Sequence, residues 1–177
     1  MIRNAPKDAA VFGVDLGKNL FHVVGLDAGG SVVQRAKFRR DTVLAFFQRA
    51  VPTLVGMEAC PGSQWFARKL QAFGHEVRIV PAQFVKPFVK SQKNDTIDAE
   101  AIAEAVTRPT MRFTQVRAID QIDVQALHRM RDQLVSSRTR LVNQARAFCL
   151  EYGIAMRQGI GTFRIDRPRV LSETATI

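Results

Sequence analysis

Strand-like and helix-like runs alternate along residues 10–106, and their order constrains the fold more than any other feature of the sequence. Tight turns separate the first three apolar runs, which cover residues 10–16, 20–26 and 31–38. Each later strand-like run follows a segment with helical spacing of apolar side chains; these runs cover residues 53–57 and 76–80. Strands joined by tight turns pair antiparallel, whereas strands joined by helices pair parallel. We therefore predict an α/β fold with a mixed sheet, an antiparallel meander followed by βαβ crossovers, flanked by helices.

A long segment without proline or glycine follows this domain, over residues 119–152. Apolar residues recur in it every seven positions, at Leu127, Leu134, Leu141 and Phe148, although the companion positions three residues later are mostly polar. We expect one long helix or a helical hairpin, similar to a coiled coil, that pairs two copies of the chain.

The expected organisation has four parts. Residues 1–8 are a tail, 9–116 the α/β domain, 117–153 the helical segment, and 154–177 a linker or the truncated start of a further domain. The last part is predicted as a linker because no periodic pattern continues beyond Gly153.

The charge of the chain favours a polyanionic partner. Lys and Arg number 26 against 16 Asp and Glu, which gives a net charge of +10, so nucleic acid is the first partner to consider. Cys60 and Cys149 are far apart and form no CxxC pair, which argues against a disulfide framework and a zinc site. No apolar run approaches the about 18 residues of a membrane span, and no signal peptide pattern opens the chain. We expect a cytoplasmic protein with no membrane partner.

Four carboxylates lie close together in the stretch KNDTIDAEAIAEA of this basic chain. At about 100° per residue, Asp95 and Asp98 fall on the apolar side of a helix. Glu100 and Glu104 fall on the opposite side, as in an ordinary solvated face. Carboxylates that face a packed sheet are costly unless they are paired or bound to a cation. The first pair can also cap the helix or favour its N-terminal dipole, so the stretch alone leaves both interpretations open.

Two further acids occur at strand ends, Asp15 in VFGVDLGKN and Glu58 in TLVGME. Functional groups gather at strand ends in open sheets, and the first strand can neighbour the strand that bears Glu58. The four convergent carboxylates, called the acidic tetrad below, are Asp15, Glu58, Asp95 and Asp98. Oxygen ligands without His or Cys suit Mg²⁺ or Mn²⁺. We therefore predict that the tetrad is a catalytic, metal-binding site for displacement at phosphorus in a phosphodiester.

Basic residues adjoin these acids in the sequence. The expected nucleic-acid-binding residues are Lys86, Lys90, Lys93, Arg39 and Arg40. They can track phosphates toward the metal site, with a salt-dependent contribution to affinity, or they can form a solvated basic surface.

Ring side chains give weaker signals. Trp65 follows the break in the chain at Pro61 and can stack on a base or anchor the core. The three histidines, His22, His75 and His128, are isolated in the sequence, so none is assigned to the metal.

Four stretches of the chain resemble the DEDD transposases of bacterial insertion sequences: VFGVDLGKNLFHV, GMEACPGSQWFARKL, KNDTIDAEAIAEA and LVNQARAFCLEYGI. These enzymes are bridge-RNA-guided recombinases with a RuvC-like, RNase H-type N-terminal domain, and the resemblance covers about residues 11–161. It implies an RNase H-like domain over residues 9–116 and a divalent metal held by the acidic tetrad. It also implies DNA and a structured guide RNA as partners, and assembly into dimers or tetramers through a coiled-coil segment.

The chain departs from the family pattern after the helical segment, because family members continue into a second domain that supplies a serine. Two alternatives therefore stay open. One is a RuvC-like nuclease that resolves DNA junctions without a guide, which the absence of copurifying RNA would favour. The other is a catalytically silent fragment that binds nucleic acid and dimerises.

Overall fold

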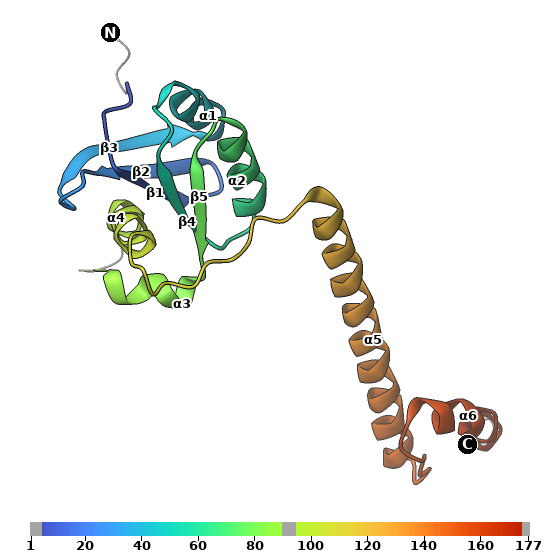
Figure 1. Cartoon of the computed structure of the whole chain (residues 1–177). Coiled ribbons are helices and arrows are strands. Elements are labelled where there is room, and N and C mark those ends of the chain that lie inside the picture. The colour runs from blue at the N-terminus through green and yellow to red at the C-terminus, as the bar shows by residue number, and fades with distance from the viewer. Residues whose placement is uncertain (1–4, 90–94, 175–177) are drawn as a thin grey trace. The chain divides into compact units, whose positions relative to one another are not determined.

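The computed structural model describes residues 5–89 and 95–174. The chain divides into two compact units, Met1–Arg117 and Ala118–Ile177, and each is described by itself (Figure 1). The first unit holds the sheet and all members of the acidic tetrad, so the candidate site belongs to that unit alone.

A five-stranded sheet of order β3-β2-β1-β4-β5 forms the centre of the first unit. Its strands are β1 (Val11–Leu16), β2 (Leu20–Leu26), β3 (Val32–Arg39), β4 (Leu54–Glu58) and β5 (Glu76–Val80). β1 pairs antiparallel with β2 and parallel with β4, while β4 pairs parallel with β5. The predicted mixed sheet is confirmed. Its order is a meander that leads into two crossover strands.

Helices cover both faces of this sheet (Figure 1). The helical segments of the unit are α1 (Arg40–Arg49), α2 (Ser63–Ala72), α3 (Ala82–Val85), the 3₁₀ turn η1 (Lys86–Phe88) and α4 (Asp95–Val106). α1 and α2 bury aromatic side chains on one face, where Phe12 meets Phe46 and Phe47 edge-on at 5.6 and 5.7 Å between ring centres. α4 packs on the other face with small residues such as Ala99 and Ala103, both fully buried. The alternation of side chains along β1 and β2 thus supplies two separate cores.

α4 approaches the sheet over two glycines, Gly13 in β1 and Gly56 in β4. A Cβ atom at Gly56 would lie 2.5 Å from a methyl carbon of Val106, and one at Gly13 would overlap the backbone of Ala99. Glycine is needed at such positions because no side chain fits between the two backbones. The helix therefore lies close against β1, with its first turn beside the carboxyl end of that strand.

The second unit contains two helices, α5 (Ile119–Glu151) and α6 (Ile160–Thr174). α5 is one continuous helix of 33 residues rather than a hairpin. α6 lies in the part predicted as a linker or the truncated start of a further domain. The helix itself was not predicted, because its apolar spacing is weak and Pro168 lies inside it. The Arg157 guanidinium binds Asp166 of α6 at 2.6 Å, which ties the preceding loop to the helix. None of the described helices combines the length and the apolar character needed to cross a bilayer.

Candidate functional site

Asp15 is the centre of the candidate site. It lies near the carboxyl end of β1, and 27% of its side chain is exposed. Burial raises the pKa of Asp15 above its ordinary value, and the nearby carboxylates of Asp95 and Asp98 raise it further. His22 lowers that pKa and Glu58 raises it, each by less. All other members of the acidic tetrad therefore lie close enough to Asp15 to change the pKa of its carboxyl group.

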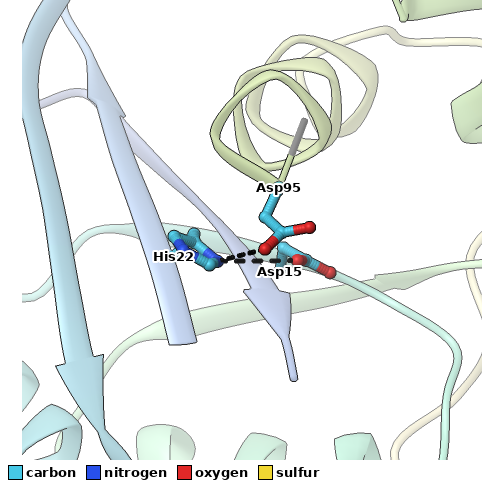
Figure 2. Close-up of side chains that lie close together, drawn as sticks. All are labelled: Asp15, His22 and Asp95. Carbon is cyan, nitrogen blue, oxygen red and sulfur yellow. Dashed lines mark ion pairs between the residues drawn. The ribbon is translucent and has the colours of Figure 1, made fainter. Parts of the chain in front are cut away.

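Figure 2 shows three side chains that converge from three elements: Asp15 from β1, His22 from β2 and Asp95 from the first turn of α4. His22 Nδ1 lies 3.6 Å from an oxygen of Asp95 and 3.9 Å from an oxygen of Asp15. One ligand atom from each of the three lies within 4.8 Å of the other two. Two carboxylates and an imidazole nitrogen thus face one small space, an arrangement that can hold a cation.

Glu58 and Asp98 reach the same region from β4 and α4. The parallel register that pairs Val14 with Met57 puts Asp15 and Glu58 at neighbouring positions as the two strands end. Asp98 lies in the first turn of α4 and is half-buried. The N-terminus of a helix favours negative charge, so α4 partly offsets the repulsion among these acids.

The acids on the other side of α4 have a different environment. Glu100 pairs with Arg35 at 2.9 Å, and Glu104 pairs with Arg108 at 2.9 Å. The helix thus separates two acids that face the candidate site from two that bind arginines. Helical periodicity predicts this division. The predicted burial is wrong: the side chain of Asp95 is 62% exposed, whereas those of Glu100 and Glu104, which were expected on a solvated face, are 21% and 27% exposed.

His22 is the residue that sequence reasoning left out of the site. It stands directly opposite Asp15 in the β1–β2 register, and a signal for this was present in the sequence. The short turn after Leu16, closed by a hydrogen bond from Gly17 N to Leu20 O at 3.0 Å, fixes the register of the hairpin. Antiparallel pairing of residues 11–16 with residues 20–26 about this turn predicts that His22 lies opposite Asp15.

Cys60 follows the strand that bears Glu58. Burial raises the pKa of the Cys60 thiol, and the carboxylates of Glu58 and Asp15 raise it further. A raised pKa disfavours the thiolate, so the half-buried Cys60 is poorly suited to act as a nucleophile.

The predicted basic residues fall in two places. Arg39 ends β3 and Arg40 begins α1, and both are exposed. Lys86 is exposed in η1, whereas Lys90 and Lys93 lie outside the described residues.

A hollow of about 600 Å³, called the Trp65 hollow below, adjoins the two arginines. It is lined by Asn19, Leu20, Arg39, Arg40, Asp41, Leu44 and Trp65. The Arg40 guanidinium lies 5.2 Å from the centre of the Phe21 ring and 5.9 Å from that of Trp65. The Trp65 residue is 37% exposed, so part of its surface faces the solvent and part packs against the core.

Residues 12–154 match the family model DEDD_Tnp_IS110, described as Transposase. The chain is 45% identical over 157 residues to the transposase for insertion sequence element IS1328 of Yersinia enterocolitica, covering 89% of this chain and 47% of that protein. It is 39% identical over 173 residues to the transposase for insertion sequence element IS1111A of Coxiella burnetii, covering 98% and 48%. The chain spans about half the length of the curated relatives it matches.

Two solved structures of RuvC from Thermus thermophilus are also similar to this chain. One is RuvC in complex with a Holliday junction substrate, with a TM-score of 0.44 at 13% identity over 60% of this chain and 100% of that chain. The other has a TM-score of 0.43 at 15% identity over 59% and 99%.

Proposed function

The chain belongs to the DEDD transposase family whose model it matches, and on that premise we propose that its first unit is a metal-dependent domain acting on DNA phosphodiesters in insertion-sequence transposition. The observation that carries the proposal is the approach of Asp15 and Asp95 to one small space at the end of β1. Burial raises the pKa of Asp15, and the nearby carboxylates of Asp95, Asp98 and Glu58 raise it further. Such clustering of like charges is unfavourable without a cation and favourable around one.

The residues of the site fit a divalent metal. Carboxylate oxygens on two strands and a helix are the donors that Mg²⁺ or Mn²⁺ takes. The acidic tetrad would hold the ion, and Mg²⁺ or Mn²⁺, when bound, would supply the positive charge that activates an attacking oxygen and stabilises a leaving one at phosphorus. β1 and β4 pair as neighbouring strands and hold Asp15 and Glu58 on hydrogen-bonded backbone, which would fix the acids relative to a bound phosphate.

We propose the Trp65 hollow as part of the DNA interface. Arg40 donates a hydrogen bond to the Lys18 carbonyl oxygen at 3.3 Å, and Lys18 lies in the turn between the strands of Asp15 and His22. An arginine held there can neutralise a phosphate close to the acids, while the exposed part of Trp65 offers a surface for a base. Lys86 is exposed in η1 and is a further candidate for a phosphate contact, while Lys90 and Lys93 are proposed from the sequence alone.

This interface is tested by single-stranded DNA binding. Loss of a stacking side chain costs about 1–3 kcal/mol, so Trp65→Ala is expected to weaken binding by roughly tenfold or more. Val51→Ala, at an exposed apolar position after α1, provides the control. Equal affinities for the wild type and Trp65→Ala would make Trp65 a core anchor only.

We propose a second copy of the chain as the partner of α5. The heptad residues Leu127, Leu134, Leu141 and Phe148 are 65%, 68%, 66% and 60% exposed, and α5 contains no buried residue. Their seven-residue spacing matches the seam of a two-helix coiled coil better than the surface of a single helix.

The guide RNA is proposed from the family resemblance. Arginines on α5 that are exposed and available to an RNA or DNA backbone include Arg129, Arg131, Arg138 and Arg140. Copurification tests this directly: RNA retained by the purified chain supports a guided recombinase, and its absence favours the alternative of a junction-resolving nuclease.

Catalysis is tested with supercoiled and branched DNA. We expect a nick that requires Mg²⁺ or Mn²⁺ and disappears in Asp98→Asn, while Glu104→Gln keeps it, because Glu104 pairs with Arg108 away from the tetrad. If wild type and Asp98→Asn alike leave the DNA intact, the chain by itself is the silent binding and dimerising fragment.

A further inference from the structure

We propose that His22 is a nitrogen ligand of the metal site and that it makes the site favour Mn²⁺ over Mg²⁺. This inference rests on the proposed function, because it adds a ligand to the acidic tetrad. It concerns a side chain that the tetrad does not include and that comes from a different strand, β2.

His22 has a buried ring nitrogen whose hydrogen-bonding capacity is unmet within the described residues. The residue is 9% exposed, and among the described residues no hydrogen-bond partner reaches its buried Nδ1 atom. The oxygens of Asp95 and Asp15 lie at 3.6 and 3.9 Å, beyond the length of a hydrogen bond. A buried polar atom without a partner is uncommon in native proteins. A bound metal ion can supply the missing partner by accepting the lone pair of the nitrogen.

The distances themselves match shared ligands of one ion. Consider two ligand atoms that each lie about 2.1 Å from a metal ion. They are about 3.0 Å apart when the ligand–metal–ligand angle is about 90°, and about 4.2 Å apart when they lie on opposite sides of the ion. The nitrogen-to-oxygen distances of 3.6 and 3.9 Å fall inside this interval. Figure 2 shows the ring edge of His22 turned toward both carboxylates.

The backbone holds His22 in this position. Its neighbours on β2, Phe21 and Val23, are fully buried, and the strand lies between β1 and β3 in the sheet. A ring on a central strand has little freedom to move away from Asp15, its cross-strand partner. His22 is therefore already oriented before an ion arrives.

The other two histidines differ from His22 in their hydrogen bonds or in their exposure to solvent. His75 is buried, but its ring nitrogens lie 3.2 Å from the backbone N–H nitrogen of Thr53 and 2.9 Å from the carbonyl oxygen of Phe47. His128 is exposed on α5. Of the three, His22 alone is a buried imidazole beside carboxylates within the described residues.

A nitrogen ligand changes which ion the site prefers. Mg²⁺ is a hard cation that takes oxygen ligands and keeps several waters. Imidazole suits transition metals, and Mn²⁺ also accepts carboxylates, so a site with both donors favours Mn²⁺. The four acids without His22 would discriminate less between the two ions.

Pulsed electron paramagnetic resonance of the Mn²⁺-loaded chain tests the assignment without an activity assay. We expect ¹⁴N modulation from a directly bound imidazole in the wild type, and its replacement by ¹⁵N modulation when the chain is produced with ¹⁵N-histidine. The modulation disappears in His22→Gln and persists in His128→Gln. The labelling experiment needs no variant, so it identifies a histidine ligand even if His22→Gln folds poorly, and within the described residues His22 is the histidine that lies beside the carboxylates.

Calorimetric titration with Mn²⁺ and with Mg²⁺ separately measures the preference. We expect His22→Gln to weaken Mn²⁺ binding by about tenfold and Mg²⁺ binding by less than about threefold. Tight Mn²⁺ binding by the wild type with no nitrogen modulation overturns the role of His22 and leaves the tetrad intact. Failure of the wild type to bind either ion overturns the proposed metal site as well.

Discussion

Gly13 of β1 lies directly against Ala99 of α4, so close that a Cβ atom on Gly13 would overlap the Ala99 carbonyl oxygen. Asp15 lies two residues further along β1, and Asp95 lies about one turn earlier in α4. The contact between the two backbones thus sets the separation of the two carboxylates. A change at Gly13 reaches the site although Gly13 has no side chain to contribute.

Gly13→Ala is expected to push α4 away from the sheet. Overpacking of this kind costs about 1–3 kcal/mol, and the displaced first turn of α4 should also weaken Mn²⁺ binding. Urea denaturation measures the first effect and calorimetric titration the second. Gly161→Ala in α6 is the control, because a Cβ atom there meets open space. Wild-type Mn²⁺ affinity in a destabilised Gly13→Ala would show that α4 does not position the ligands.

Asp15→Asn is expected to stabilise the metal-free chain at neutral pH. Burial, then Asp95 and Asp98, raise the pKa of Asp15 in the folded state above the ordinary value of 3.8. The associated stability is fully present below pH 3.8 and is lost as the pH rises through the folded-state pKa, so the ionised carboxylate destabilises the fold at pH 7. Calorimetry in EDTA should show a higher melting temperature for Asp15→Asn, by roughly 2–4 °C for each kcal/mol gained.

The pH dependence provides the check on that prediction. The advantage of Asp15→Asn should shrink as the pH falls from 7 toward 4, because the wild-type carboxyl group then takes up a proton. Asp123→Asn, at an exposed carboxylate on α5, should show no such trend. An advantage that is constant with pH would mean that Asp15 does not carry the unfavourable charge.

Asp95→Asn and Asp98→Asn are each expected to weaken Mn²⁺ binding by about tenfold or more. Mutation of residues that only support metal ligands already lowers metal affinity by about tenfold, and loss of a ligand should lower it at least as much. Glu104→Gln should leave the affinity unchanged, because Glu104 pairs with Arg108 on the other side of α4. Isothermal titration compares the three variants. Equal losses in all three would contradict the assignment of helix faces.

Much of the fold was predictable because its signals are local. The predicted strand at residues 20–26 coincides with β2, and the acid pair of α4 follows from helical periodicity. The position of His22 beside Asp15 was not predicted, because it depends on the pairing of β1 with β2 and not on neighbours in the chain. α6 was missed for a similar reason: the Arg157–Asp166 pair ties it to its preceding loop, and its apolar periodicity is weak.

Leu134→Asp and Leu141→Asp are expected to shift the chain toward monomer in analytical ultracentrifugation. A charge in the apolar seam of a coiled coil loses its hydration when two helices pair, which disfavours association. Thr139→Asp adds the same charge on a different side of α5 and should leave the mass unchanged. An unaltered sedimentation profile for both leucine variants would exclude α5 as the pairing element.

We propose that carboxylates from β1, β4 and α4 form one site for a divalent cation. Anomalous diffraction from crystals grown with Mn²⁺ locates such a cation. We expect an anomalous peak within about 2.5 Å of carboxylate oxygens of both Asp15 and Asp95. Crystals saturated with Mn²⁺ that show no peak between these two residues would contradict this proposal.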